Sequence, residues 1–171
     1  GQAMKQPDKE HFMRAMVKEI DDLSKAEVWE LVRRSDLPDD IKPIRAIWSF
    51  KRKRAPDGTY LKHKARLCAH GGMQVEGEHY WDTYSPVVKW TTLRFMMVLS
   101  QTLGLSSRSI DFTLAYTQAP IDVDIYLHIP AGFDIEGEDR RDFLLKLKKN
   151  LYGLKQAGLS WYDTIRTHLI S

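Results

Sequence analysis

Two strand-like runs joined by a Pro-Asp-Gly turn constrain the fold of this chain more than any other feature. The runs occupy residues 44–54 and 60–68, and the residues between them read Ala-Pro-Asp-Gly-Thr. Proline presets φ and glycine accepts a positive φ, so this spacing predicts an antiparallel hairpin. Because side chains alternate between the two faces of a strand, we expect Leu61, Ala65 and Leu67 on one face.

The opposite face of the predicted hairpin is cationic. It carries Lys62, Lys64 and Arg66 from the second run, and Lys51 and Lys53 share a face of the first run. The whole chain has a net charge of only +3, whereas residues 51–70 contain seven lysines and arginines against one acidic residue, Asp57. A clustered basic patch is typical of a protein that binds a phosphate-bearing partner, and a solvated surface is the alternative interpretation.

The rest of the pattern predicts one α+β domain. Apolar spacing predicts an amphipathic helix over residues 8–23 through Phe12, Met16, Ile20 and Leu23, a buried helix over 91–103 and a helix over 155–170. Short strands are expected at residues 28–32, 109–116, 125–129 and 143–147. Cys68 is the only cysteine, which indicates a reducing compartment, and neither a membrane span nor a signal peptide is predicted.

Asp111 is the leading candidate for a catalytic residue. It lies in the apolar run Ser109-Ile110-Asp111-Phe112-Thr113-Leu114-Ala115-Tyr116, five positions before an aromatic ring. A polymerase needs a carboxylate for metal ions and a ring that contacts the sugar. The alternatives are a partnered structural carboxylate at position 111 and a core role for Tyr116.

Motifs along nearly the whole chain resemble one family. They include Lys64-Ala65-Arg66-Leu67-Cys68-Ala69-His70-Gly71, Tyr84-Ser85-Pro86-Val87, Ile125-Tyr126-Leu127 and Leu151-Tyr152-Gly153-Leu154-Lys155-Gln156-Ala157. In this order they resemble the reverse transcriptase, an RNA-dependent DNA polymerase, of copia-type LTR retrotransposons. The resemblance implies a right-hand polymerase with an antiparallel sheet and packed helices, in which residues 1–86 and 121–150 form the fingers and residues 87–120 and 151–171 part of the palm.

The resemblance also implies roles for individual residues. Asp111 matches the family's first catalytic aspartate, the Phe112 carbonyl would face the metal, and Tyr116 would exclude a ribose 2′-hydroxyl. The other nucleotide-binding residues implied are Lys64, Arg66, Lys155 and Gln156, and we expect nucleic acid to contact Lys51, Lys53, Lys62 and Gly153.

The implied cofactor is Mg²⁺, with Mn²⁺ as a substitute, and the implied partners are dNTPs, a primed RNA or DNA template and other polyprotein domains. The expected location is the cytoplasm, in a virus-like particle. We expect the family's paired aspartates beyond Ser171, so this chain alone is expected to be inactive. Two alternatives stay open: a module that binds nucleic acid or a protein partner without chemistry, and a structural piece of a polyprotein.

Overall fold

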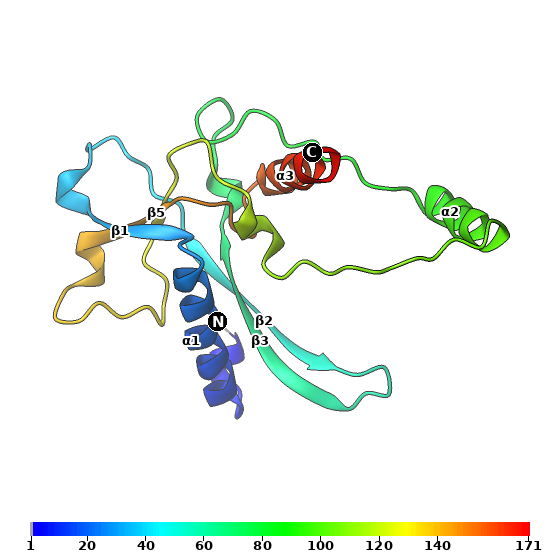
Figure 1. Ribbon diagram of the computed structural model, residues 1–171. Coiled ribbons are helices and arrows are strands. Elements are labelled where there is room, and N and C mark those ends of the chain that lie inside the picture. Colours follow the sequence, from blue (N-terminus) through cyan, green and yellow to red (C-terminus); the bar gives the residue numbers. More distant parts are fainter. Residues whose placement is uncertain (1) are drawn as a thin grey trace.

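The hairpin predicted from the Pro-Asp-Gly turn is present in the computed structural model, which describes residues 2–171 (Figure 1). Strands β2 (Ala46–Arg54) and β3 (Tyr60–Ala69) pair antiparallel. In the turn, Gly58 has φ +88°, and the Thr59 N–H donates to the Asp57 carboxylate at 2.9 Å. Of the three residues predicted to share one face, Ala65 and Leu67 are buried, whereas Leu61 is exposed near the tip.

A second sheet forms from the short strands. Strands β1 (Trp29–Arg33), β5 (Phe143–Leu147) and β4 (Tyr126–His128) lie in the order β1-β5-β4, and both pairings are antiparallel. β5 is buried at four of its five positions because it is the central strand. The predicted α+β class is therefore confirmed, but the antiparallel strands form two sheets.

The first helix packs along the hairpin. Helix α1 (Lys9–Lys25) buries Phe12, Met16 and Leu23, as its apolar spacing predicts. The fourth buried residue is Glu19, whereas Ile20 is half-buried. α1 lies beside β3, so the core forms between α1, the base of the hairpin and the three-stranded sheet (Figure 1).

A buried polar network precedes the last helix, α3 (Ala157–Ile170). The Gln74 amide donates to the Gln156 side-chain oxygen at 2.8 Å, and the Gln156 amide donates to the His79 carbonyl at 3.1 Å. The Lys155 N–H donates to the Gln74 side-chain oxygen at 2.8 Å. This network holds the loop after β3 against the start of α3.

Helix α2 (Trp90–Thr102) confirms the predicted helix but not its burial. None of its residues is buried, and the helix lies apart from the other elements on two extended segments (Figure 1). An apolar helix is buried only where another surface packs on it, and within the described chain no element packs extensively against α2. Among residues 2–171, no helix combines the length and the apolar character that a membrane span requires.

The strand predicted at residues 109–116 was wrong. Residues 105–112 are irregular and exposed, and a 3₁₀ turn, η4 (Ala115–Gln118), follows. A strand needs a neighbour that shares its hydrogen bonds, and among the described residues none pairs with 109–116. The remaining 3₁₀ turns are Gln2–Lys5, Arg34–Asp36, Gly71–Met73 and Arg140–Asp142.

Candidate functional site

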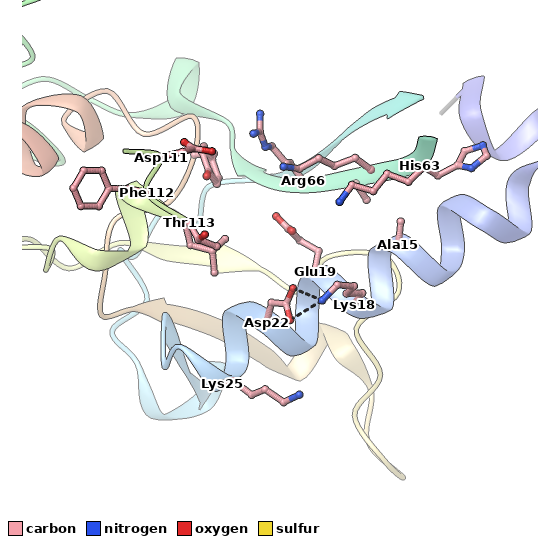
Figure 2. Close-up of a pocket in the computed structure, with 15 residues that line it drawn as sticks. Ala15, Lys18, Glu19, Asp22, Lys25, His63, Arg66, Asp111, Phe112 and Thr113 are labelled. Atoms are coloured by element: carbon pink, nitrogen blue, oxygen red, sulfur yellow. Dashed lines mark hydrogen bonds and ion pairs between the residues drawn. The ribbon is translucent and has the colours of Figure 1, made fainter. Parts of the chain in front are cut away.

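A cavity of about 620 Å³ lies between α1, β3 and the segment that carries Asp111 (Figure 2). Its volume is within the range of roughly 300–1,000 Å³ that is usual for small-molecule sites. Lys64 and Arg66 line it from β3, Asp111 and Phe112 from the irregular segment, and Glu19 from α1. The structure therefore brings the predicted catalytic aspartate into one cavity with two of the predicted nucleotide-binding residues, Lys64 and Arg66.

The strand register creates the cationic face beside this cavity. Lys51 lies directly opposite Lys64, and Lys53 lies opposite Lys62, so each pair projects to the same side of the hairpin. Like charges directly opposite each other destabilise a sheet. Among residues 2–171, these four lysines and Arg66 form no ion pair within 4.0 Å. Burial lowers the pKa of Lys64, and the positive charge of Arg66 lowers it further.

The other face of the hairpin is neutralised. Arg52 donates two hydrogen bonds to Asp8, at 2.7 and 2.9 Å, and His63 Nε2 lies 2.6 Å from the same carboxylate. The hydrogen bonds from Arg52 and His63 hold the pKa of Asp8 well below its usual range. The Phe12 ring packs edge-on against His63, 4.4 Å between centroids. Charge is thus balanced where the hairpin packs on α1 and unbalanced on the face that carries the five cations.

A strained turn follows Asp111. Leu114 has φ +52°, a left-handed conformation that costs a residue other than glycine about 1–3 kcal/mol. Its carbonyl accepts hydrogen bonds from the Thr117 N–H at 3.0 Å and the Thr117 hydroxyl at 2.8 Å, which stabilise the turn. The Phe112 ring packs edge-on against Trp161, 5.0 Å between centroids. These contacts fix the chain on both sides of Asp111, whose side chain is exposed to the cavity (Figure 2).

The predicted sugar-contacting ring, Tyr116, is not part of the cavity lining. Tyr116 packs edge-on against Tyr152, 5.2 Å between centroids, and Tyr152 does line the cavity. The guanidinium of Arg66 lies 5.0 Å from the Tyr152 ring centroid. Tyr152 therefore connects Tyr116 to Arg66, a contact that spacing in the sequence does not predict.

Three other predicted residues lie outside the cavity. The Lys155 ammonium sits over the Tyr80 ring and donates to its hydroxyl at 3.0 Å. Gln156 is buried, and its side-chain oxygen and nitrogen are both hydrogen-bonded, to Gln74 and to the His79 carbonyl. Gly153 has φ +90°, and a Cβ atom there would lie 2.2 Å from the Ala69 carbonyl oxygen, so backbone conformation and packing together account for glycine at this position. Direct contacts of these three residues with nucleotide or template stay predictions.

Glu19 is a cavity residue to which the sequence reasoning gave no role. Its side chain points from α1 toward β3, and the residue is 8% exposed (Figure 2). Burial raises the pKa of Glu19, while the Leu67 N–H and the charges of Lys64 and Arg66 oppose that rise. The available signal was a glutamate three residues after Met16 and four before Leu23, within the apolar stripe of an amphipathic helix.

The described residues include no complete metal site, and Asp111 and Phe112 stay predicted ligands. The Asp111 carboxylate and the Phe112 carbonyl are hard oxygen donors of the type that Mg²⁺ takes, but Mg²⁺ prefers six ligands. Residues 2–171 contain no group of three His, Cys, Asp or Glu side chains positioned to hold a metal ion. These residues do not complete a site by themselves.

Comparison with known proteins places the chain in a family. Residues 26–171 match the family described as reverse transcriptase (RNA-dependent DNA polymerase). The chain is 34% identical over 161 residues to the retrovirus-related Pol polyprotein from transposon TNT 1-94 of Nicotiana tabacum, covering 94% of this chain and 12% of that protein. It is 34% identical over 170 residues to the Pol polyprotein from transposon RE2 of Arabidopsis thaliana, covering 99% of this chain and 11% of that protein.

A yeast relative is similar to the same degree. The chain is 35% identical over 170 residues to the transposon Ty1-ER2 Gag-Pol polyprotein of Saccharomyces cerevisiae, covering 95% of this chain and 9% of that protein. No solved structure matches the chain significantly. The chain thus spans roughly a tenth of these polyproteins, and the resemblance carried by its motifs is confirmed. The chain belongs to the reverse transcriptase family of copia-type LTR retrotransposons.

Proposed function

We propose that this chain is the part of a reverse transcriptase that binds the incoming dNTP and the template. The whole protein would synthesise DNA on RNA and DNA templates. One observation carries the proposal. The cavity joins Asp111 to Lys64 and Arg66, two cations that form no ion pair within 4.0 Å among the described residues. A triphosphate is the polyanion that fits a polymerase cavity of this charge.

In this proposal Lys64 and Arg66 bind the triphosphate oxygens, and Asp111 supplies a carboxylate next to them. Phe112 contributes its backbone carbonyl, and Tyr116 limits the space for the sugar indirectly, by supporting the ring of Tyr152, which lines the cavity. The cationic face formed by Lys51, Lys53 and Lys62 contacts the phosphates of the template. Residues 1–86 and 121–150 would then be fingers, and residues 87–120 and 151–171 part of the palm.

Phosphoryl transfer of this class relies on positioning and charge stabilisation. Mg²⁺ or Mn²⁺, when bound, supplies the charge that neutralises the reacting phosphates. Asp111 alone does not hold such an ion, so we propose that the nucleotide and other parts of the polyprotein provide the remaining ligands. We propose further that the protein acts in the cytoplasm within a particle, and that this chain by itself does not synthesise DNA.

Primer extension tests the enzymatic proposal. In a polyprotein-derived polymerase that contains this chain, Asp111→Asn should abolish dNTP incorporation while leaving template binding intact. Asp122→Asn is the matched control, because Asp122 is a carboxylate that does not line the cavity. Wild-type synthesis by Asp111→Asn would show that Asp111 is structural.

The second candidate is a module that binds nucleic acid without chemistry. The cationic face of the hairpin, whose lysines and Arg66 form no ion pair within 4.0 Å among the described residues, suffices for that role. If five phosphates are neutralised, the slope of log affinity for duplex DNA against log salt is about −4.5. Binding with this slope, together with no synthesis by the polymerase-length protein, would support the module over the enzyme.

Charge variants locate the binding face. Lys51→Gln combined with Lys53→Gln should make the slope of log affinity against log salt less steep by about 2, because two phosphate contacts are lost. The control is Arg140→Gln combined with Lys148→Gln, which removes two exposed cations from outside the hairpin. An equal effect of the two double variants would show that the protein binds through its overall charge rather than through the hairpin.

A further inference from the structure

Burying the carboxylate of Glu19 costs folding free energy. It occupies a position of α1 whose neighbours along the stripe, Met16 and Leu23, are apolar and buried. Burying a carboxylate is unfavourable unless it is hydrogen-bonded or paired, and an apolar side chain at this position would avoid that cost. A costly group that lines a ligand cavity requires an explanation beyond helix packing.

The hydrogen bond of Glu19 reaches the free edge of β3. In the register of the hairpin, Leu67 lies opposite Trp48, and its N–H points away from β2. The Leu67 N–H donates to Glu19 Oε1 at 3.3 Å. Two residues further on, the Ala69 N–H points to the same side and donates to the Tyr152 carbonyl at 2.7 Å. The edge of β3 is thus fixed at one point by α1 and at a second by the turn before α3.

The fixed segment is the one that carries the cavity's cations. Lys64 and Arg66 precede Leu67 on β3, and both affect the ionisation of Glu19 without forming an ion pair with it. Glu19 and Asp111 both line the cavity, from different elements (Figure 2). A shift of the β3 edge would move both cations relative to Asp111.

We propose that Glu19 is a positioning residue of the nucleotide site, because its carboxylate holds the edge of β3 so that Lys64 and Arg66 face Asp111. This inference rests on the proposed nucleotide-binding function. Its role is exerted through the Leu67 N–H and does not require contact with the nucleotide. An acceptor oxygen at position 19 matters more for this role than the negative charge does.

Two variants separate the acceptor from the charge. Glu19→Gln keeps the side-chain oxygen and removes the charge, whereas Glu19→Met keeps the length and removes both. The probe is inorganic tripolyphosphate, titrated calorimetrically into the 171-residue chain at low salt and at a temperature where circular dichroism shows every variant folded. Asp21→Asn is the control, since it removes an exposed carboxylate of the same helix that does not line the cavity.

We expect Glu19→Met to bind tripolyphosphate about fivefold more weakly, which corresponds to the net loss of one hydrogen bond, and Glu19→Gln to stay within about twofold of the unaltered chain. Hydrogen exchange of the Leu67 amide should accelerate in Glu19→Met and not in Glu19→Gln. If the carboxylate only repels phosphate, both variants bind more tightly, and the inference is wrong. It is also wrong if Glu19→Met lowers thermal stability while its folded form binds with unchanged affinity.

Arg66→Gln distinguishes failure of this inference from failure of the proposed function. If Arg66→Gln loses affinity and Glu19→Met does not, the cavity binds triphosphate and only the positioning role is refuted. If the unaltered chain does not bind tripolyphosphate, both the nucleotide site and the positioning role that depends on it are refuted.

Discussion

Replacing Gly153 by alanine should destabilise the chain more than any other single methyl addition in a turn. A Cβ atom at position 153 would lie 2.2 Å from the Ala69 carbonyl oxygen, whereas real Cβ contacts are essentially never shorter than 3.0 Å. The turn and β3 would have to separate by about 0.8 Å to reach that limit. The same movement would stretch the 2.7 Å hydrogen bond from the Ala69 N–H to the Tyr152 carbonyl.

The magnitude follows from three contributions. A left-handed alanine costs about 1–2 kcal/mol, a lost backbone hydrogen bond costs about 1 kcal/mol, and overpacking costs about 1–3 kcal/mol. We therefore expect Gly153→Ala to lower the free energy of unfolding by roughly 3–6 kcal/mol, a large fraction of the stability of a domain. Urea denaturation followed by tryptophan fluorescence measures this change.

Two glycines separate the contributions. Gly58 has φ +88°, and no atom lies within 4 Å of the place that an added methyl group would occupy, so Gly58→Ala should cost only about 1–2 kcal/mol of backbone strain. A Cβ at Gly71 would lie 2.1 Å from the Gly153 carbonyl oxygen, and Gly71 does not have a positive φ. Gly71→Ala should therefore show the steric cost without the strain. If Gly153→Ala and Gly58→Ala lower the free energy of unfolding by the same amount, within about 1 kcal/mol, the role of close packing at Gly153 is refuted.

Two carboxylates should affect the pH dependence of stability in opposite directions, as measured by urea unfolding at a series of pH values. The pKa of Asp8 is depressed by Arg52 and His63, so its contribution is present above the pKa of the unfolded carboxyl and is lost as the pH falls. The Asp8→Asn variant should have a lower free energy of unfolding at neutral pH, and its free energy of unfolding should fall less as the pH is lowered. An unchanged fall toward acid pH would refute the role of the ion pair between Asp8 and Arg52. The pKa of Glu19 is raised by burial, so the folded state retains its proton to a higher pH and stability falls as the pH rises through that window. Glu19→Gln should remove that fall, and an unchanged profile would show that the carboxylate is solvated.

Local patterns predicted the elements that depend on local contacts. The hairpin follows from its turn residues, α1 from the spacing of Phe12 and Met16, and the three strands of the second sheet from short apolar runs. Turn chemistry and side-chain periodicity act over a few residues, so a single sequence carries them. The assignment of Lys64 and Arg66 to one side of β3 came from strand alternation and agrees with the cavity.

Features that depend on distant partners were not predicted. The exposure of α2 and the irregular conformation at Asp111 both reflect the lack of a neighbouring element within the described chain, which periodicity does not report. The burial of Glu19 depends on contact with β3, some 48 positions away. The packing reason for Gly153 likewise depends on the backbone at Ala69.

The distribution of unbalanced charge argues that the cavity is the functional part of this chain. Where the start of α1 meets the hairpin, the charges are matched, as Asp8 is with Arg52. The α1 side of the cavity holds the pair Lys18–Asp22. On its β3 side the charges are not matched, because Lys51 faces Lys64 on the sheet, and neither Lys64 nor the buried carboxylate of Glu19 forms an ion pair within the described residues. Local costs of this kind persist mainly at sites where function opposes stability. A bound polyanion would relieve the repulsion among the cations, so the arrangement that weakens the free chain is one that would favour the proposed triphosphate.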